Sequence, residues 1–230
     1  MAFVHGSKAR VFLNGYDLST DTKSLSFALA VDTAESSTLG TTAKTYVVGL
    51  NDATLSLEGI FNGAVDTADD IIRVALASVA VDNYTYFMQG FALGNPGYGF
   101  AAHTTSYEAS ADIGDVSQWS LEGQSNTGTE PLRLYHDYVA EAAGGQTGSV
   151  DNTLVQTILG GVGYLHASTG AALVVKVQDS ADNTTFADIL TFNTVAGRTS
   201  ERRVIAGTVR RYTRVLWTGT GTFAVAFGRY

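Results

Sequence analysis

The chain has 230 residues, of which 45% are hydrophobic and 16% are charged, with a formal net charge of −8. This length allows one large domain or two modest ones, and this apolar content excludes disorder as the main state. The absence of Cys excludes disulfides, thiolate zinc sites, iron–sulfur clusters and cysteine catalysis, while 25 Gly and many aromatic residues favour strands and turns.

The first predicted elements are two strands and a loop. A short apolar run beginning at Arg10 is broken at Asn14-Gly15, a pair typical of a tight turn between strands. Leu25, Phe27 and Leu29 alternate with small residues and predict a second strand. The segment 32–45 is polar and nearly free of large apolar residues, so we expect a long exposed loop there.

The next elements are a strand and a helix. Alternating apolar residues from Ala53 to Phe61 predict a strand with one buried face. From Asp66 to Val81 the apolar spacing changes to that of a helix of roughly four turns, with acidic residues near its start. Further strands are expected at 84–91, 103–110 and 116–121, and a turn at 94–99.

The sequence divides near Pro131. Pro131 and the glycine-rich run 144–148 bracket a predicted linker, 131–147, between a first domain, 1–130, and a second domain, 148–230. Short alternating runs throughout 148–230 predict a second, smaller β-sandwich. Residues 1–130 have a net charge of −10 and residues 131–230 a net charge of +2, which argues against tight nucleic-acid binding by the first part.

Motifs of catalysis and metal binding are absent from the sequence. It contains no GxSxG elbow and no Walker-type phosphate loop, and its four His are isolated from one another. Asp179, Asp182 and Asp188 crowd one segment, but their spacing suits a polar hairpin tip better than a calcium loop. We therefore expect no enzyme activity, no catalytic or metal-binding residues and no cofactor.

Two segments resemble a known family. Gly6 to Ser19 and Asn51 to Phe61, together with the strand at Ser120 to Gly123, resemble the major tail tube proteins of long-tailed, siphovirus-type bacteriophages. The resemblance covers about residues 5 to 130. It implies a mainly β fold, a tail-tube-type sandwich or partial barrel with one flanking helix, here followed by the appended β-sandwich at 148–230.

The resemblance also implies a function and partners. Copies would join into rings, commonly of six in the family, that stack into the tail tube, the conduit for DNA delivery into the host. Partners would be the chain itself, tape-measure, tail-terminator and baseplate proteins, and double-stranded DNA that transits the lumen without specific binding. The protein would lie in the virion tail, and in the host cytoplasm during assembly. No apolar run is long enough to span a membrane, so we expect no membrane partner.

Three sets of site residues follow from these expectations. In the family, the N-terminal arm and the long loop contact the next ring, which here maps onto 1–8 and 32–45, with a central loop set of Ser36, Ser37, Thr38, Leu39, Gly40, Thr41 and Thr42. An acidic lining keeps DNA from sticking, so we expect some of these residues to face the lumen: Asp17, Asp21, Asp52, Glu58, Glu108, Asp112, Asp115 and Glu122. A basic strand is expected to meet an acidic neighbouring subunit through Arg203, Arg210, Arg211 and Arg214.

Other functions stay open. A carbohydrate- or cell-surface-binding β module would be monomeric or form small oligomers, and Tyr164, Trp217 and Tyr230 could stack on its sugar, although core or interface positions are expected for them. A neck terminator or a capsid decoration protein would form one closed ring or a capsid-bound trimer.

Overall fold

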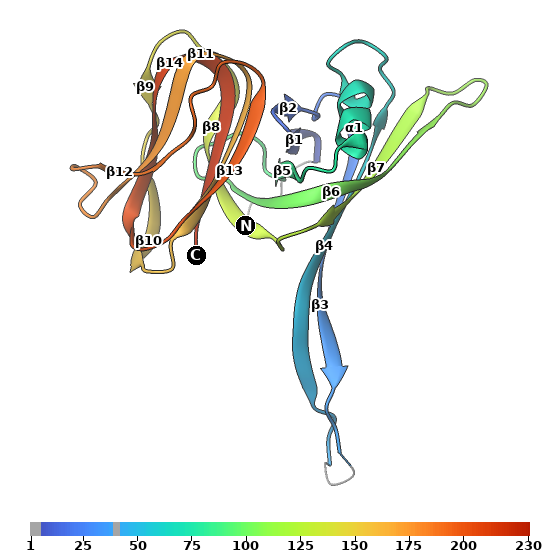
Figure 1. Ribbon diagram of the computed structural model, residues 1–230, viewed down its shortest axis with the longest axis horizontal. Helices are drawn as coiled ribbons and strands as arrows, with labels where there is room; N and C mark the ends of the chain where they lie inside the picture. The colour runs from blue at the N-terminus through green and yellow to red at the C-terminus, as the bar shows by residue number, and fades with distance from the viewer. Residues whose placement is uncertain (1–5, 39–41) are drawn as a thin grey trace. The chain divides into compact units, whose positions relative to one another are not determined.

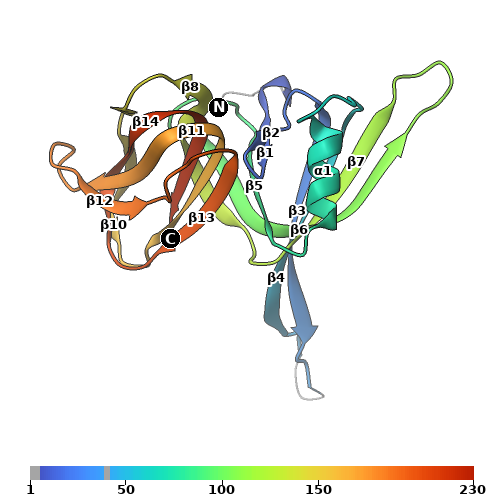
Figure 2. The same cartoon turned by 45° about the horizontal axis from the view of Figure 1, so that its top comes forward.

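The computed structural model describes residues 6–38 and 42–230, which form two compact units. Unit 1 contains the described residues up to Thr20, together with Asp82–Phe100 and Glu130–Tyr230. Unit 2 contains Asp21–Val81 and Ala101–Thr129. The mainly β architecture that the sequence predicts is confirmed, with one α-helix among the described residues (Figures 1 and 2).

Among the described residues, the elements in chain order are a short 3-10 turn, Gly6–Lys8, followed by fourteen strands and one helix. Unit 2 contains β3 (Thr22–Glu35), β4 (Tyr46–Ile60), α1 (Ala68–Ala77), β7 (Gln118–Ser125) and most of β6 (Pro96–Ser110). Unit 1 contains the first residues of β6. It also contains the remaining strands: β1 (Arg10–Leu13), β2 (Tyr16–Asp17), β5 (Asp82–Phe87), β8 (Glu130–Glu141), β9 (Gly145–Gln146), β10 (Val150–Thr157), β11 (Gly161–Ser180), β12 (Ala187–Thr191), β13 (Thr199–Ile205) and β14 (Val209–Arg229).

Unit 1 is built around one long antiparallel pair of strands. Strands β11 and β14 pair from Gly161↔Arg229 to Ser180↔Tyr212, with register shifts that mark bulges along the way. The first part of β11 also pairs with β13, and its later part pairs with β12. In the same way β14 pairs first with β10 and later with β8. Side chains of this pair, among them Val175, Trp217 and Phe223, lie in one buried core cluster.

A second core cluster joins the two ends of the chain. Phe12 of β1 and Phe87 of β5 pack in one buried cluster with Leu132, Tyr164 and Ala226. Most of the segment 131–147 also lies in strands β8 and β9, and the side chains of its early residues Leu132 and Leu134 are buried. The compact units therefore group residues differently from the predicted domains 1–130 and 148–230, since β1 and β5 share a core with the C-terminal strands.

The Asn14-Gly15 turn between β1 and β2 is confirmed. Asn14 and Gly15 have φ of 49° and 87°, as the two central residues of a type I′ turn require. A Cβ on Gly15 would lie 2.5 Å from the carbonyl oxygen of Thr199 and 2.7 Å from that of Ala167, so only glycine fits. This close approach holds the β1–β2 turn against β11 and β13.

His166 of β11 lies buried beside this turn. The Gly15 N–H donates to its Nδ1 at 3.2 Å, so the neutral ring carries its proton on Nε2, which lies 3.1 Å from Thr85 Oγ1. Phe12 stacks on the imidazole at 5.6 Å between ring centroids. Burial lowers the pKa of His166 to about 3, because the charged ring would be desolvated.

This environment predicts a loss of stability in acid. Between pH 6.5 and pH 3 the folded His166 binds fewer protons than the unfolded one, so the free energy of unfolding falls as the pH falls below 6.5. By pH 5 the loss is about 2 kcal/mol. Urea unfolding at pH 8 and pH 5 should show a smaller difference for His166→Gln than for the unchanged chain, whereas His103→Gln, at a half-exposed position, should behave like the unchanged chain. Equal pH dependence in all three proteins would contradict the prediction.

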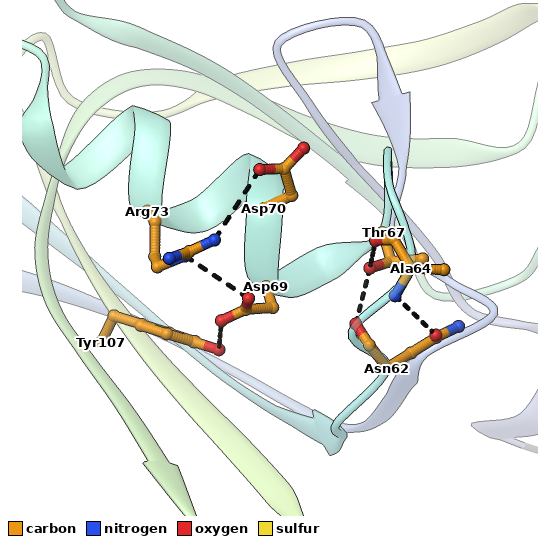
Figure 3. A network of polar contacts seen from close by, with 7 residues as sticks. All are labelled: Asn62, Ala64, Thr67, Asp69, Asp70, Arg73 and Tyr107. Carbon is orange, nitrogen blue, oxygen red and sulfur yellow. Dashed lines mark hydrogen bonds and ion pairs between the residues drawn. The ribbon is translucent and has the colours of Figure 1, made fainter.

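Unit 2 is an antiparallel sheet in the order β3–β4–β7–β6 with α1 on one face. As predicted, Leu55 and Leu57 of β4 are buried and alternate with residues on an open face. Leu57 pairs with Leu121, and Leu121 pairs with Tyr107, whose hydroxyl donates to Asp69 of α1 at 2.5 Å (Figure 3). The row of apolar residues therefore lies on the face that α1 covers.

The helix is shorter than the sequence predicts. It ends at Ala77, whereas the predicted helix extends to Val81, and Val79 is 97% exposed. The hydroxyl of Thr67 donates to the carbonyl oxygens of Asn62 and Ala64, both at 2.6 Å, rather than capping the helix (Figure 3). The β-branched Val79 and Val81 have low helix propensity and no packing surface that would extend the helix.

Two other local predictions need correction. The segment expected to be a loop from residue 32 begins as strand, because β3 continues to Glu35 and pairs there with Tyr46 of β4. The turn expected at 94–99 is confined to its first residues, because β6 begins at Pro96 and Gly97 pairs with Leu132. A Cβ on Gly97 would lie 2.2 Å from the ring of Phe87, so this glycine serves close packing inside a strand.

Candidate functional site: the open face and the free hairpin of unit 2

The face of the unit 2 sheet opposite α1 is open and acidic. One row across its strands runs Ser24–Glu58–Ser120–Glu108, each residue paired with the next. The neighbouring row runs Ser26–Ser56–Glu122–Ser106. Glu58, Glu108 and Glu122 are exposed, and small hydroxyl side chains separate them. We call these two rows, with Asp52, Thr54 and Gln124 beside them, the acidic face.

The sequence-predicted lumen residues divide into those on this face and those elsewhere. Asp52 belongs to the acidic face, where its carboxylate accepts a hydrogen bond from the Gln124 side chain. Asp112 and Asp115 are exposed in the loop between β6 and β7. Asp21 lies 3.4 Å from the backbone N–H of Ala68 at the start of α1, and Asp17, in unit 1, accepts from the N–H of Ser19. The role of all eight in lining a lumen stays a prediction.

Unit 2 concentrates the negative charge of the chain. Its two segments contain twelve Asp and Glu against three Lys and Arg, a net charge of −9, so the rest of the chain has a net charge of +1. The acidic face contains four of these carboxylates and no Lys or Arg. A surface of this kind repels a polyanion over about a Debye length, roughly 8 Å at physiological salt.

Beyond the acidic face, β3 and β4 continue as a hairpin. Strand β7 pairs with β4 only from Thr54 to Ile60, and no other described strand pairs with β3. The segments 29–35 and 46–53 therefore pair only with each other, as a two-stranded ribbon (Figure 1). We call these two segments the free hairpin.

The free hairpin carries large apolar side chains in solvent. Val47 and Val48, which point to opposite faces of the ribbon, are 58% and 69% exposed, and Leu50 is 80% exposed. Leu29, Val31 and Tyr46 are each about half exposed. A two-stranded hairpin is marginally stable by itself, and exposed strand edges with apolar side chains mark surfaces that a partner covers. Sequence analysis missed these residues, although the run from Tyr46 to Leu50 is strongly β-forming.

The predicted ring-contact loop lies at the end of the free hairpin. The backbone N–H of Ser36 donates to the carbonyl of Thr45 at 2.8 Å, and Ser37 Oγ accepts from the N–H of Thr45 at 3.0 Å. Thr38 and Thr42 are exposed, and Leu39, Gly40 and Thr41 lie outside the described residues, as do residues 1–5 of the N-terminal arm. The contact role of this loop stays a prediction.

The four arginines of the predicted basic strand lie on two strands and have partners inside unit 1. Arg203 is on β13, whereas Arg210, Arg211 and Arg214 are on β14. Arg211 pairs with Asp151 through two contacts of 2.8 and 2.7 Å, and Arg214 Nε donates to Gln178 at 2.9 Å. Arg203 and Arg210 lie 3.5 and 3.8 Å from carboxylates of Glu201 and Asp179. The pairing of these arginines with an acidic neighbouring subunit stays a prediction.

The aromatic residues considered for sugar stacking are mostly unavailable. Tyr164 and Trp217 are buried in the two core clusters of unit 1, as the core interpretation predicts, and Tyr230 is partly exposed. Within residues 6–38 and 42–230, no group of three or more His, Cys, Asp or Glu side chains is arranged to hold a metal ion. None of the helices in the described part of the chain is long and apolar enough to cross a membrane.

Comparison with known proteins finds similarity only among solved structures. No protein-family model and no curated protein matches the sequence. A chain of the native gene transfer agent virion is 14% identical over 55% of this chain and 97% of its own length, with a TM-score of 0.47. The SPP1 tail tube protein is 10% identical over 56% of this chain and 78% of its own, with a TM-score of 0.48.

A longer similarity spans both units. The SPP1 Dit protein, described as a hub of the phage adsorption apparatus, is 12% identical over 95% of this chain and 97% of its own, with a TM-score of 0.37. Such identities and TM-scores carry no conclusion about function.

Proposed function

We propose that this protein is a structural subunit of a bacteriophage tail, whose copies join into rings that stack into the tail tube of a siphovirus-type phage. The observation that carries the proposal is the sheet of unit 2, which combines an open acidic face with a free hairpin that no other described strand covers. The resemblance of residues 6–19 and 51–61 to tail tube proteins supports the same assignment.

We expect copies to assemble through the outer edge of β3 and through the exposed apolar side chains of the free hairpin. The outer edge of β3 offers backbone groups to another chain, and the free hairpin offers apolar side chains on both faces. A contact between two different surfaces of identical copies closes into a ring when the rotation closes, and a second such contact along the axis stacks the rings. Rings of six copies, and contacts with tape-measure, terminator and baseplate proteins in the virion tail, belong to this proposal.

The acidic face is proposed to line the lumen. Phosphate groups bind proteins through clustered cations, so a wall of carboxylates and hydroxyls lets double-stranded DNA pass without being held. No catalytic group, cofactor or metal is required for this role, which rests on shape and charge alone.

Electron microscopy of the purified protein in negative stain, combined with mass measurement by size-exclusion chromatography and light scattering, tests the proposal. Hollow tubes with a regular axial repeat are the expected result. A single closed ring that does not elongate would instead assign the protein to a terminator or hub position. A monomer that retains glycans would favour the carbohydrate-binding module.

Reversing charge on the acidic face should make tubes hold DNA inside. The variant Glu58→Lys/Glu122→Lys, assembled in the presence of a short DNA duplex, should co-sediment the duplex and protect it from a nuclease, because the new cations face the lumen. The control Asp66→Lys/Asp70→Lys changes the charge equally near α1, on the other side of the sheet, and should leave bound duplex open to digestion. Equal digestion with both variants would mean that the acidic face does not line the lumen.

A further inference from the structure

The dipeptide Asn-Gly occurs twice in the chain, at Asn14-Gly15 and at Asn62-Gly63. In this dipeptide the backbone nitrogen of the glycine can attack Cγ, the side-chain carbonyl carbon of the asparagine, because no Cβ on the second residue hinders the approach. Gly15 is buried in unit 1, whereas Asn62 and Gly63 are both exposed in unit 2. The two copies of the dipeptide therefore differ in their access to this reaction.

Asn14-Gly15 is held by hydrogen bonds at the groups that the reaction uses. The N–H of Gly15, whose nitrogen would attack, donates to Nδ1 of His166 at 3.2 Å. The side-chain amide of Asn14 donates to Asp82 at 2.6 Å and accepts from the backbone N–H of Asn83 at 2.9 Å. The reaction at this site therefore requires the turn to open first.

Asn62-Gly63 lies in the exposed loop between β4 and α1. Within the described part of the chain, the N–H of Gly63 donates no hydrogen bond, so its nitrogen is available for the attack. The N–H of Ala64 donates to Oδ1 of Asn62 at 3.2 Å, which holds the side chain of Asn62 against the backbone that follows it (Figure 3). The same N–H stabilises the negative charge that develops on Oδ1 during the attack.

We propose that Asn62 is a site of spontaneous covalent modification in the folded protein. The nitrogen of Gly63 loses its proton to hydroxide and forms a bond to Cγ of Asn62. The bond from Cγ to Nδ2 then breaks, and Nδ2 takes up a proton from water and leaves as ammonia. Water opens the resulting five-membered imide at either of its two carbonyl carbons, which gives aspartate in an ordinary peptide linkage or isoaspartate. The inference concerns the subunit itself and does not rest on the proposed function.

Both products change the connection that leads into α1. Each replaces a neutral amide with a carboxylate and so adds negative charge to unit 2, whose net charge is already −9. In isoaspartate the backbone runs through the side chain and is longer by a methylene group. The backbone carbonyl oxygen of Asn62, which accepts from the hydroxyl of Thr67 at 2.6 Å, then belongs to the new carboxylate (Figure 3). The loop before α1 therefore changes with the time since synthesis.

Peptide mass spectrometry tests the proposal, with Asn14 as a control inside the same chain. Trypsin, which cuts after Lys and Arg, releases Asn14 in the peptide 11–23 and Asn62 in the peptide 45–73, and fragmentation locates the modified residue. After incubation of the folded protein at pH 8, we expect the mass shift of an amide converted to an acid at Asn62. Its rate should be at least about tenfold higher than the rate at Asn14, which reacts only from the open turn. At pH 6 the rate at Asn62 should fall, because hydroxide is needed to remove the proton from the nitrogen of Gly63.

Two controls separate the effect of the fold from that of the dipeptide. In concentrated urea at pH 8 both loops are lost, so Asn14 and Asn62 should convert at similar rates. Gly63→Ala should keep the fold, because a Cβ there would lie 3.5 Å from the ring of Phe61, an ordinary contact distance. This variant should lose most of the conversion at Asn62, since its methyl group hinders the attack. Equal rates at the two sites in the folded protein, or an unmodified Asn62 in the folded protein when both sites convert in urea, would overturn the proposal.

Discussion

Replacing Glu130 with glutamine is expected to lower the free energy of unfolding of unit 1 by about 3–5 kcal/mol, the range found when one partner of a buried ion pair is removed. Glu130 is 5% exposed at the start of β8. Its carboxylate accepts hydrogen bonds from the hydroxyls of Tyr164 and Tyr230 and from the guanidinium of Arg202, whose Nε lies at 3.0 Å. The change leaves the charge of the partly buried Arg202 without its counterion.

The pKa shifts of Arg202 and Tyr230 agree with the hydrogen bonds that Glu130 accepts from them. The hydrogen bond from Arg202 to Glu130 raises the pKa of Arg202, so this guanidinium stays charged. Burial, with the negative charge of Glu130 as the next cause, raises the pKa of Tyr230 to about 12. Both tyrosines therefore stay protonated as donors to the carboxylate.

A surface pair provides the matched control for Glu130→Gln. Asp151 binds Arg211 with the same two-pronged geometry, but both side chains are about 40% exposed. Asp151→Asn should change the free energy of unfolding far less, since solvent screens exposed pairs. Urea unfolding of the three proteins at pH 7 compares them directly. A loss for Glu130→Gln no larger than that for Asp151→Asn would contradict the prediction.

The second large effect is expected at the free hairpin. The variant Val48→Asp/Leu50→Asp should abolish tube assembly while the subunit stays folded, because both side chains are exposed in the subunit. If the contact buries them, losing two apolar groups removes about 3–6 kcal/mol per contact, more than a hundredfold in the association constant. Light scattering and electron microscopy at increasing concentration measure assembly, and circular dichroism checks the fold.

The control for the hairpin variant makes the same chemical change on the other side of the sheet. Val65→Asp/Val74→Asp alters two exposed residues before and within α1, at 84% and 68% exposure, and should assemble like the unchanged chain. Normal assembly of the hairpin variant would remove the free hairpin from the proposed contact.

Local patterns predicted local structure well. The Asn14-Gly15 turn and the alternation along β4 follow from backbone preferences and from one buried face, and both are confirmed. The strand at Asp32–Glu35 escaped prediction because neither face of the free hairpin is buried by the fold, so its sequence has no apolar period. The same polar sequence would suit a loop.

Long-range arrangements could not be predicted in this way. The polarity of Glu58 indicates an open face of β4, but its convergence with Glu122 and Glu108 depends on the register of three strands far apart in the sequence. Arg210 and Arg211 find Asp179 and Asp151 by strand pairing that no spacing rule anticipates. For the same reason no local pattern predicts that Phe12 and Tyr164, which lie far apart in the sequence, share one core cluster.

Because β1 and β5 share a core with the C-terminal strands, unit 1 completes its fold only after these strands have been synthesised. The sheet of unit 2 closes within the span from Thr22 to Ser125, whereas Gly15 must wait for His166, 151 residues later, and β11 must wait for β14. At about 5–20 residues per second, the ribosome needs roughly 5–20 s to pass from Ser125 to Arg229. During that interval β1 and β5 lack their partners on the C-terminal strands, so unit 1 becomes available for assembly only after β14 has been made.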